Sequence, residues 1–499
     1  MASQEIDDRP KDGEAGSASI AEAETEPLLT TIFGVMGNVL EWYDFALFGF
    51  FSDIISDVFF PEEDEDDEHS NLIKSFAIFG SAFLMRPIGG MLIGYVGDKH
   101  GRKHALTRSL FLMAIPTTLM GLLPTYDQVG GLAIVLLVLC RLLQGISVGG
   151  QLPASLVYTV EKRDPAHWGY YGALPMVAAN CGTLLGNLCG AFMREILTQE
   201  QLRDFGWRLP FFSGIIIAFV ACYLSRHGQD VHTNANVYDS ETSEIKNPLR
   251  AAFRRENRLA LFSTSLGPML WAAGFYLTYV WLAIYMEELL DPSVTNAFWV
   301  NACSLFFGMT FMLPIAGHAS DRLGRIRTMT VAALALMVAG PIMLVVIARG
   351  GSFAAFLAQW SVGVMLSFFG APLCAWLVES FDSSVRLTSA SLGYDLAHAI
   401  AAGYSPAMAT ALFKDVGKYA PGMLYTIFGF LSLVGIYTNH FCGGKNLTVE
   451  GGDASTTGST NLSNNNGISS ANGTGNGDLE LSSNSNTPDE NNVPLPQIS

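Results

Sequence analysis

Twelve apolar segments, each long enough to cross the hydrocarbon core of a bilayer, constrain this chain more than any other feature. A transmembrane helix needs about 20 mostly apolar residues to span about 30 Å. Such segments recur at 31–56, 71–97, 105–124, 131–160, 169–194, 207–225, 258–287, 295–319, 327–348, 352–379, 386–413 and 420–440. The composition agrees, with 50% hydrophobic and 15% charged residues and a mean hydropathy of +0.31. The sequence therefore predicts an all-α polytopic membrane protein with twelve transmembrane helices.

Basic residues concentrate in alternate loops. Lys and Arg cluster after the second, fourth, sixth and eighth segments, whereas the loop at 61–69 reads PEEDEDDEH. Because cytoplasmic loops carry the excess of basic residues, we expect both termini in the cytoplasm. We expect a plasma-membrane protein. An endomembrane is the alternative, since ETEPLL, ending at Leu29, resembles an acidic dileucine sorting signal.

A polar stretch divides the segments into two sets of six. We expect an acidic disordered tail at 1–30, a six-helix bundle at 31–225, a cytoplasmic loop at 226–257, a second six-helix bundle at 258–440 and a disordered tail rich in Asn, Ser and Gly at 441–499. GYVGDKHGRKHAL after the second segment is echoed by GHASDRLGRIRTM after the eighth. Internal duplication of this kind is typical of transporters, so the sequence predicts two pseudo-symmetric halves.

The duplicated loops are candidates for a cytoplasmic gate. Each copy places an Asp, a short spacer and Gly-Arg at a tight turn between two helices, and the gate residues we expect are Asp98, Arg102, Asp321, Arg322 and Arg325. Such an Asp can face an Arg or the positive N-terminus of a neighbouring helix. A polar contact that breaks in one conformation would serve as a gate; ordinary basic loops are the alternative.

These loops and several other motifs resemble a known family. The paired loops resemble the signature loop of the major facilitator superfamily, and RLLQGISVGG (Arg141 to Gly150) resembles its fourth-helix motif. NVLEWYDFALFGF, FLMRPIGGMLIGYVGDKHGRK, GWRLPFF and VRLTSASLGYDLAHAI resemble the metabolite:proton symporter group, which includes carriers of proline and betaine, α-ketoglutarate, citrate and shikimate. The resemblance runs from about residue 31 to 440, and it implies the major facilitator fold.

Small residues predict close helix packing. Gly145 and Gly149 in the fourth segment, and Gly182, Gly186 and Gly190 in the fifth, are spaced four apart. A stripe of small residues lets helix backbones approach each other. The alternative is a chance pattern in a chain with 50 glycines.

Two carboxylates lie in the first apolar segment. Each acid costs about 2.5–3.5 kcal/mol at a helix centre, so Glu41 and Asp44 need a wet cavity, a partner or a proton. Asn38, Glu41 and Asp44 are three apart, which gathers them on one broad side of a helix. We expect that side to face a central cavity, with Asn38 binding substrate and at least one acid in proton coupling or substrate contact. A structural acid satisfied by Arg86 or another helix is the alternative.

Arg141 is the other inward charge expected in the first half, because resembling carriers place a fourth-helix Arg near the cavity. It could pair with Glu41 or Asp44 in proton coupling, or bind an anionic substrate group bidentately. A plain salt bridge is the alternative. Gln144 and Gln151 of the same segment are expected to bind substrate.

The eleventh segment offers a second acid. Ser391, Asp395 and His398 fall on one helical face, and an Asp–His pair inside a membrane suits a proton relay; a structural His is the alternative. Many resembling proteins have Glu where this chain has Gln151, and Asn where it has Asp395. We therefore hypothesise that proton coupling has shifted partly toward the eleventh helix.

The seventh segment is rich in aromatic residues. Tyr276, Tyr279 and Trp281 are amphipathic rings suited to lining a substrate cavity or stacking on a cation. Packing or anchoring at the membrane interface is the alternative.

Together these features predict a secondary active transporter. We expect it to carry a proton with a small organic acid or a zwitterion such as proline or betaine, by alternating access. A uniporter or exchanger with the same cavity, and a non-transporting nutrient sensor, are alternatives. No phosphate loop, nucleophile motif or metal-ligand spacing appears in the sequence. We therefore expect no enzyme activity, cofactor, metal or nucleic-acid partner, and we expect the chain to work as a monomer in the bilayer.

Overall fold

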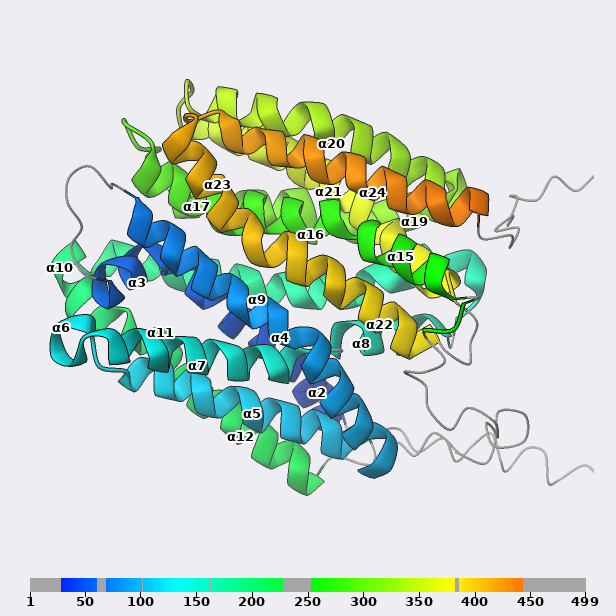
Figure 1. The fold of residues 1–499 in the computed structure, drawn as a ribbon, viewed down its shortest axis with the longest axis horizontal. Helices are drawn as coiled ribbons and strands as arrows, with labels where there is room; N and C mark the ends of the chain where they lie inside the picture. The colour runs from blue at the N-terminus through cyan, green and yellow to red at the C-terminus, as the bar shows by residue number, and fades with distance from the viewer. Residues whose placement is uncertain are drawn as a thin grey trace, which may run out of the picture. The chain divides into compact units, whose positions relative to one another are not determined.

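Helices make up the regular structure of this chain. The structure is a computed structural model that describes residues 28–60, 69–100, 102–149, 151–161, 163–227, 253–255, 257–381 and 386–442. Within these ranges every regular element is a helix (Figure 1). All of them belong to one unit, Met1–Gly451. The predicted all-α fold is confirmed.

The first half of the chain, through His227, contains six long helical regions. Its elements are α2 (Leu28–Phe50), α3 (Ser52–Phe59), α4 (Ser70–His100), α5 (Arg102–Leu122), α6 (Tyr126–Val129), α7 (Gly131–Val148), α8 (Gln151–Glu161), α9 (Trp168–Ile196), α10 (Gln199–Gln201), α11 (Arg208–Phe211) and α12 (Ser213–His227). The fourth region differs from the prediction, because 131–160 is two helices that are interrupted at Gly149. A side chain at Gly149 would overlap the carbonyl oxygen of Arg86, so the chain approaches α4 backbone to backbone there.

The second half, from Arg258, is interrupted more often. Its elements are α15 (Arg258–Leu266), α16 (Met269–Phe275), α17 (Leu282–Ile284), α18 (Ala297–Ser304), α19 (Met312–Leu323), α20 (Arg325–Ile347), α21 (Ser352–Glu379), α22 (Arg386–Ala397), α23 (Gly403–Asp415) and α24 (Met423–Cys442). Short π-helical turns join several of them, at Tyr276–Trp281, Tyr285–Leu289, Leu305–Thr310 and His398–Ala402. Such turns often accompany functional sites.

Ten helical stretches in the described part of the chain are long and apolar enough to cross a membrane. They match ten of the twelve expected segments. The other two, 31–56 and 386–413, are also helical over most of their length. Two features set these segments apart. Side chains of α2 are described only from Val39 onward. The eleventh segment carries Arg386, Asp395 and His398 among many small residues, which lowers its mean hydropathy.

The two halves of the chain contact each other most extensively along two helix pairs. One pair is α9 with α19, and the other is α4 with α23 (Figure 1). Glycines allow both approaches: Gly169 faces the backbone of Gly317, and Gly80 faces the backbone of Gly403. The predicted close packing at Gly145 is also confirmed, since a side chain there would overlap the carbonyl oxygen of Ala82. Backbone contact of this kind is typical of membrane helices.

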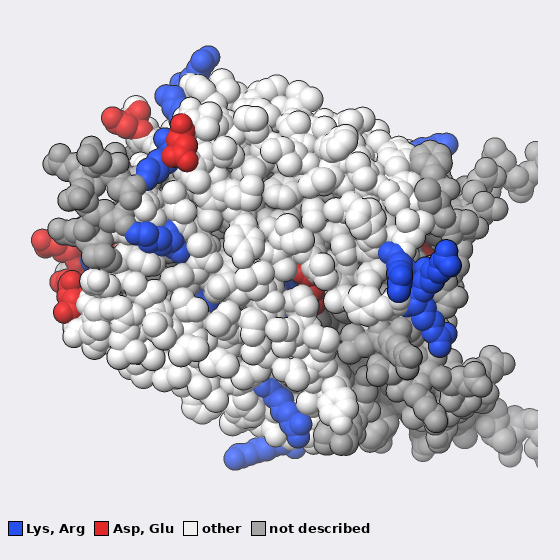
Figure 2. Space-filling view, in the orientation of Figure 1, with Lys and Arg blue, Asp and Glu red and all other residues white. Residues whose placement is uncertain are grey.

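The charge on the surface is distributed as expected for a membrane protein. On the face in view, most charged side chains lie toward the left and right ends, a few basic ones lie at the lower edge, and the broad centre shows only small charged patches (Figure 2). Large apolar side chains such as Phe219, Val331 and Phe353 are about 70% exposed on the surface of their helices. Such exposure is stable where the surrounding solvent is lipid rather than water.

Candidate functional site

The two acids of α2 are both buried but have different surroundings. Asp44 is fully buried, and its Oδ2 accepts a hydrogen bond of 2.8 Å from Nε2 of Gln144. Glu41 is 2% exposed, and its Oε2 has no hydrogen-bond partner within the described residues. Each acid thus has one buried oxygen without a donor among the described residues, Oδ1 of Asp44 and Oε2 of Glu41, and Asp44 is also held by Gln144 of the first half.

Arg141 reaches Asp44 only through Gln144. Its NH1 donates to Oε1 of Gln144 at 2.9 Å, and the same amide donates onward to Asp44. The guanidinium also lies over the rings of Phe45 and Phe48, at 4.8 and 4.5 Å from their centroids. The predicted link between Arg141 and an acid is present, but it is indirect, and Gln144 is the connecting residue.

A buried ion pair joins the two halves of the chain. Nε of Arg86, on α4, lies 3.3 Å from Oδ1 of Asp395, on α22, and both side chains are 1% exposed or less. His398 instead has its Nδ1 2.9 Å from the carbonyl oxygen of Tyr394, and the two rings lie 3.9 Å apart. Arg86 is therefore an ionic partner of Asp395, and the predicted pairing of Asp395 with His398 stays a prediction.

A small cavity lies beside these groups. Its volume is about 10 Å³, room for about one water. It is lined by Trp42, Met176, Ala179, Asn180, Trp271, Phe275, Tyr276, Tyr394 and His398. Four of these, Trp42, Asn180, Tyr276 and Tyr394, have buried polar atoms without a hydrogen-bond partner in the described part of the chain. Natural proteins rarely leave such atoms unpaired, so the lining is suited to a polar ligand.

The predicted aromatic lining of the seventh segment is correct for only one residue. Tyr276 lines the cavity. Trp281 instead donates from Nε1 to Oγ1 of Thr410 at 3.0 Å and stacks on Tyr285. Tyr279 is fully buried, and its hydroxyl lies so close to Gly363 that a side chain at position 363 would overlap it. The prediction that Tyr279 and Trp281 line the cavity is wrong, because the π-helical turn directs them into the packing of the second half.

Four other predicted residues cannot be placed. The side chains of Asn38, Gln151, Asp98 and Arg102 lie outside the described residues. Their roles stay predictions.

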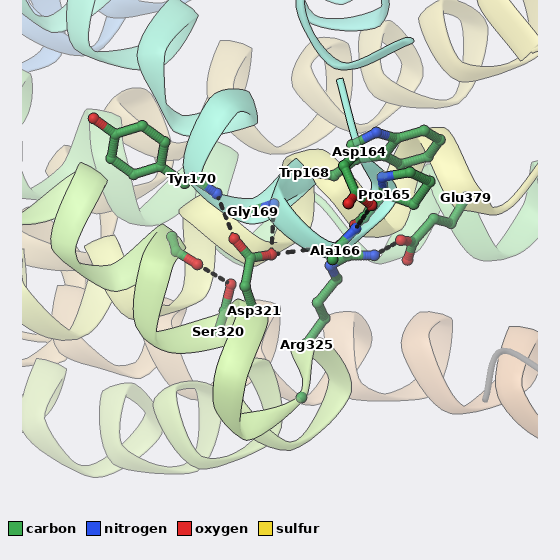
Figure 3. A network of polar contacts seen from close by, with 12 residues as sticks. Asp164, Pro165, Ala166, Trp168, Gly169, Tyr170, Ser320, Asp321, Arg325 and Glu379 are labelled. Carbon is green, nitrogen blue, oxygen red and sulfur yellow. Dashed lines mark hydrogen bonds and ion pairs between the residues drawn. The ribbon is translucent and has the colours of Figure 1, made fainter. Parts of the chain in front are cut away.

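The second predicted gate loop makes the contact that its sequence suggested. Asp321, at the end of α19, accepts hydrogen bonds from the backbone N–H groups of Gly169 and Tyr170, at 2.8 and 3.0 Å (Figure 3). These N–H groups belong to the first turn of α9 and have no partner inside their own helix. The carboxylate also faces the positive end of the helix dipole. Asp321 thus caps a helix of the other half.

Arg325 completes this contact. Its NH2 donates to the carbonyl oxygen of Pro165 at 2.6 Å and lies 3.4 Å from Asp321, while its NH1 pairs with Glu379. Arg322 is exposed. We call Asp321, Arg325 and Glu379, with their backbone partners at Pro165, Gly169 and Tyr170, the Asp321 cluster. It joins the two halves at the end that carries the basic loops.

A second inter-half contact lies farther along α9. Asn187 donates to the carbonyl oxygen of Phe298 at 2.9 Å, and Asn301 donates to Oδ1 of Asn187 at 3.1 Å. Gln359 donates to the side chain of Asn301. All three side chains are fully buried. We call Asn187, Asn301 and Gln359 the Asn301 cluster; at 1.5 Å per residue it lies about 27 Å along α9 from Gly169.

Sequence reasoning missed several of these residues. Arg86 was considered only as a partner for the acids of the first segment, although a charge inside an apolar segment is itself a signal of function. Trp42 and Asn180 gave no signal, because one aromatic or amide side chain in an apolar helix is not distinctive. The Asn301 cluster has no sequence motif.

Comparison with known proteins agrees with this geometry. The profile of the Major Facilitator Superfamily matches residues 45–406. The chain belongs to this superfamily. Its fold agrees, since a crystal structure of a D-xylose-proton symporter aligns with a TM-score of 0.63 at 18% identity, covering 82% of this chain and 95% of that one. The partially occluded inward-open xylose transporter XylE from E. coli aligns with a TM-score of 0.61 at 18% identity, covering 84% and 98%.

Sequence relatives within the superfamily confirm the resemblance to metabolite:proton symporters. The chain is 33% identical to the citrate-proton symporter of Klebsiella pneumoniae over 400 residues, 77% of this chain and 86% of that protein. It is 28% identical to a putative proline/betaine transporter of Staphylococcus aureus (strain MSSA476), covering 84% and 89%. It is 29% identical to the alpha-ketoglutarate permease of Escherichia coli (strain K12), covering 80% and 90%. This major facilitator protein is therefore an integral, multi-pass membrane protein of a family of transporters rather than of enzymes.

Proposed function

We propose that this chain is a proton-coupled symporter of a small organic acid or zwitterion, with a zwitterion of the proline or betaine type favoured. The observation that carries the proposal is the small cavity with unpaired polar atoms on Trp42, Asn180, Tyr276 and Tyr394, where Trp42 follows the acid Glu41 on α2. Aromatic walls suit an ammonium group, and unpaired N–H and O–H groups suit a carboxylate. Relatives named as symporters of citrate and transporters of proline or betaine support the same ligand chemistry.

Alternating access follows from the two inter-half contacts. We propose that the first and second halves act as two six-helix bundles that rock about the cavity. Breaking the Asp321 cluster would open the cavity toward one side, and breaking the Asn301 cluster would open it toward the other. The Asn301 cluster consists of hydrogen bonds, and the Asp321 cluster of hydrogen bonds and the ion pairs of Arg325; water can replace these contacts, so neither cluster prevents opening.

The charged residues have separate proposed roles. Asp395 and Glu41 are our candidates for proton coupling, because Asp395 pairs across the halves and Glu41 keeps an oxygen without a partner. Asp44, Gln144 and Arg141 form a hydrogen-bonded chain within the first half that we propose fixes the position of α2.

Other substrate and proton contacts remain part of the same proposal. Tyr276 would contact substrate directly, and Asn38 and Gln151 stay proposed substrate contacts. His398 would accept or pass on a proton from its position in the cavity wall.

We further propose a monomer in the plasma membrane with both termini in the cytoplasm. The support is the charge pattern: the Asp321 cluster lies among the basic loops, which mark the cytoplasmic side.

The test is uptake by purified protein in proteoliposomes. Labelled proline, betaine, α-ketoglutarate, citrate and shikimate are offered with an imposed pH gradient. We expect at least one to accumulate, and we expect a protonophore to abolish accumulation. Accumulation that survives the protonophore would favour an exchanger, equilibration without accumulation a uniporter, and binding without flux a sensor.

A further inference from the structure

Arg86 is a buried charge whose guanidinium is only partly paired within the described part of the chain. Its side chain is fully buried, yet NH1 and NH2 have no hydrogen-bond partner there. Only Nε has an ionic partner in the structure, Asp395 at 3.3 Å. A guanidinium offers five donors in a planar fork that matches a carboxylate. One edge of this fork is therefore occupied by an acid of the protein, and the other edge is unpaired.

The guanidinium of Arg86 lies near one wall of the cavity. The guanidinium carbon is 6.0 Å from the ring centroid of Trp42, which lines the cavity. The charge of Arg86 also acts on Tyr276 and Tyr394, two more lining residues, and on Glu41. A carboxylate that enters the cavity would therefore meet Arg86 together with Asp395.

We infer that Arg86 binds the carboxylate of a zwitterionic substrate, and that this carboxylate displaces Asp395, which then takes up the transported proton. This inference rests on the proposed proton-coupled symport and names the coupling step. No covalent bond forms. One ion pair, Arg86 with Asp395, is exchanged for another, Arg86 with the substrate, and one proton from solution binds the released carboxylate of Asp395.

Buried charge explains why the proton must accompany the carboxylate. Before exchange, Arg86 and Asp395 are together neutral. A second carboxylate on the same guanidinium would leave one buried negative charge unpaired, which is costly in a membrane interior. Protonation of Asp395 removes that negative charge, so the guanidinium keeps one anionic partner, and a deprotonated Glu41 would balance the positive group that the zwitterion brings. The positive group of the zwitterion would then face Glu41 and the aromatic ring of Trp42.

Other titratable groups near Asp395 do not replace it in this step. Arg86 of α4 pairs with it directly, and the titratable groups around Arg86 and Tyr394 are Glu41 of α2, Tyr276 of the seventh helix, and Tyr394, His398 and Cys374 of the second half. Asp395 alone among the acids shares an ion pair with the guanidinium in the described structure.

The experiment measures proton-linked binding to the full chain in nanodiscs. Glycine betaine is titrated calorimetrically from pH 5.5 to 8.5 in buffers of different ionisation enthalpy, which reports protons taken up per ligand. Choline, which has the same onium group without the carboxylate, is the matched ligand. We expect betaine to bind with about one proton, its Kd rising about tenfold per pH unit in the alkaline range. We expect choline to bind with none. This comparison needs no variant.

Variants then locate the proton and the carboxylate. Asp395→Asn should bind betaine with a Kd that no longer depends on pH and without proton uptake. Arg86→Lys should weaken betaine binding roughly 10- to 100-fold and choline binding far less, because the bidentate fork is lost. Asp53→Asn is the control: it breaks another buried Arg–Asp pair, with Arg194 at 2.7 Å, and should keep the wild-type pH dependence.

Several results would overturn the inference. They are an unchanged pH slope in Asp395→Asn, equal proton uptake with choline, or unchanged betaine affinity in Arg86→Lys. Failure of both betaine and proline to bind the wild-type protein would also overturn the inference. Proton-driven uptake of citrate or α-ketoglutarate in that case would leave the proposed symport intact, whereas no gradient-driven uptake of any of the five compounds would end both.

Discussion

Replacing Asp321 tests the inter-half contact most sharply. Its carboxylate accepts hydrogen bonds from Gly169 and Tyr170 and lies beside Arg325. Asp321→Ala removes all three interactions. Hydrogen bonds to a charged group contribute about 1.5–3 kcal/mol net. We count one such contribution for the two N–H groups together, because water can enter the space that alanine leaves and accept part of their hydrogen bonding. At 1.4 kcal/mol per factor of ten, the closed contact should weaken roughly 10- to 150-fold.

Amide hydrogen exchange reads this contact directly. Gly169 and Tyr170 lie in the first turn of α9, where N–H groups have no intrahelical acceptor, so their protection depends on Asp321 from the other half. Mass spectrometry of peptides covering Trp168 to Gly172 should show protection lost by a comparable factor in Asp321→Ala. The loss of protection in Asp321→Asn should lie between those of the wild-type protein and Asp321→Ala, because an amide oxygen still accepts one hydrogen bond but carries no charge.

A neighbouring acid supplies the control. Asp164 accepts a hydrogen bond from Ala166 at 3.0 Å within the first half, at the same end of the molecule (Figure 3). Asp164→Asn should leave exchange at Gly169 and Tyr170 unchanged. Wild-type protection in Asp321→Ala would refute the reasoning, since it would mean that Asp321 does not hold the N-terminus of α9.

Three further predictions concern packing and the cavity. Gly145→Val should lower the midpoint of thermal unfolding in detergent, because its side chain would overlap the backbone of α4 and overpacking costs about 1–3 kcal/mol; an unchanged midpoint would contradict the close approach. Asn187→Ala should destabilise the closed state by about 1–3 kcal/mol, because it leaves buried partners unpaired, and thiol labelling of a cysteine introduced at Met176 should become faster. Tyr276→Phe should raise the KM for uptake several-fold, whereas Trp281→Phe should change stability and leave KM near wild type; equal effects on KM would show that the cavity lining is wrongly assigned.

The fold was predictable because its determinants are local. Long apolar segments and the charge of the loops specify how many helices cross the membrane, and spacing within the repeated loop predicted that Asp321 would face a helix N-terminus. The interruption near Gly149 was not predictable, because a run of apolar residues reads as a continuous helix until the neighbouring backbone is known.

The site was predictable only in part, for two physical reasons. The pairing of Arg86 with Asp395 joins residues far apart in the chain, and no periodicity within one segment reveals such a contact. The second reason is helix register. A step of one residue turns a side chain by about 100° around a helix, so the π-helical turn at Tyr276–Trp281 decides which rings meet the cavity. Tyr276, Tyr279 and Trp281 were therefore equivalent in the sequence but are not in the structure.

The central claim is that substrate and proton move together. Proteoliposomes containing the purified chain and an internal pH indicator are given an inward gradient of the compound that the uptake assay identifies, with no imposed pH difference. The account predicts internal acidification that follows substrate entry in the wild-type protein and is lost in Asp395→Asn. Substrate entry at the wild-type rate with no change in internal pH would contradict it.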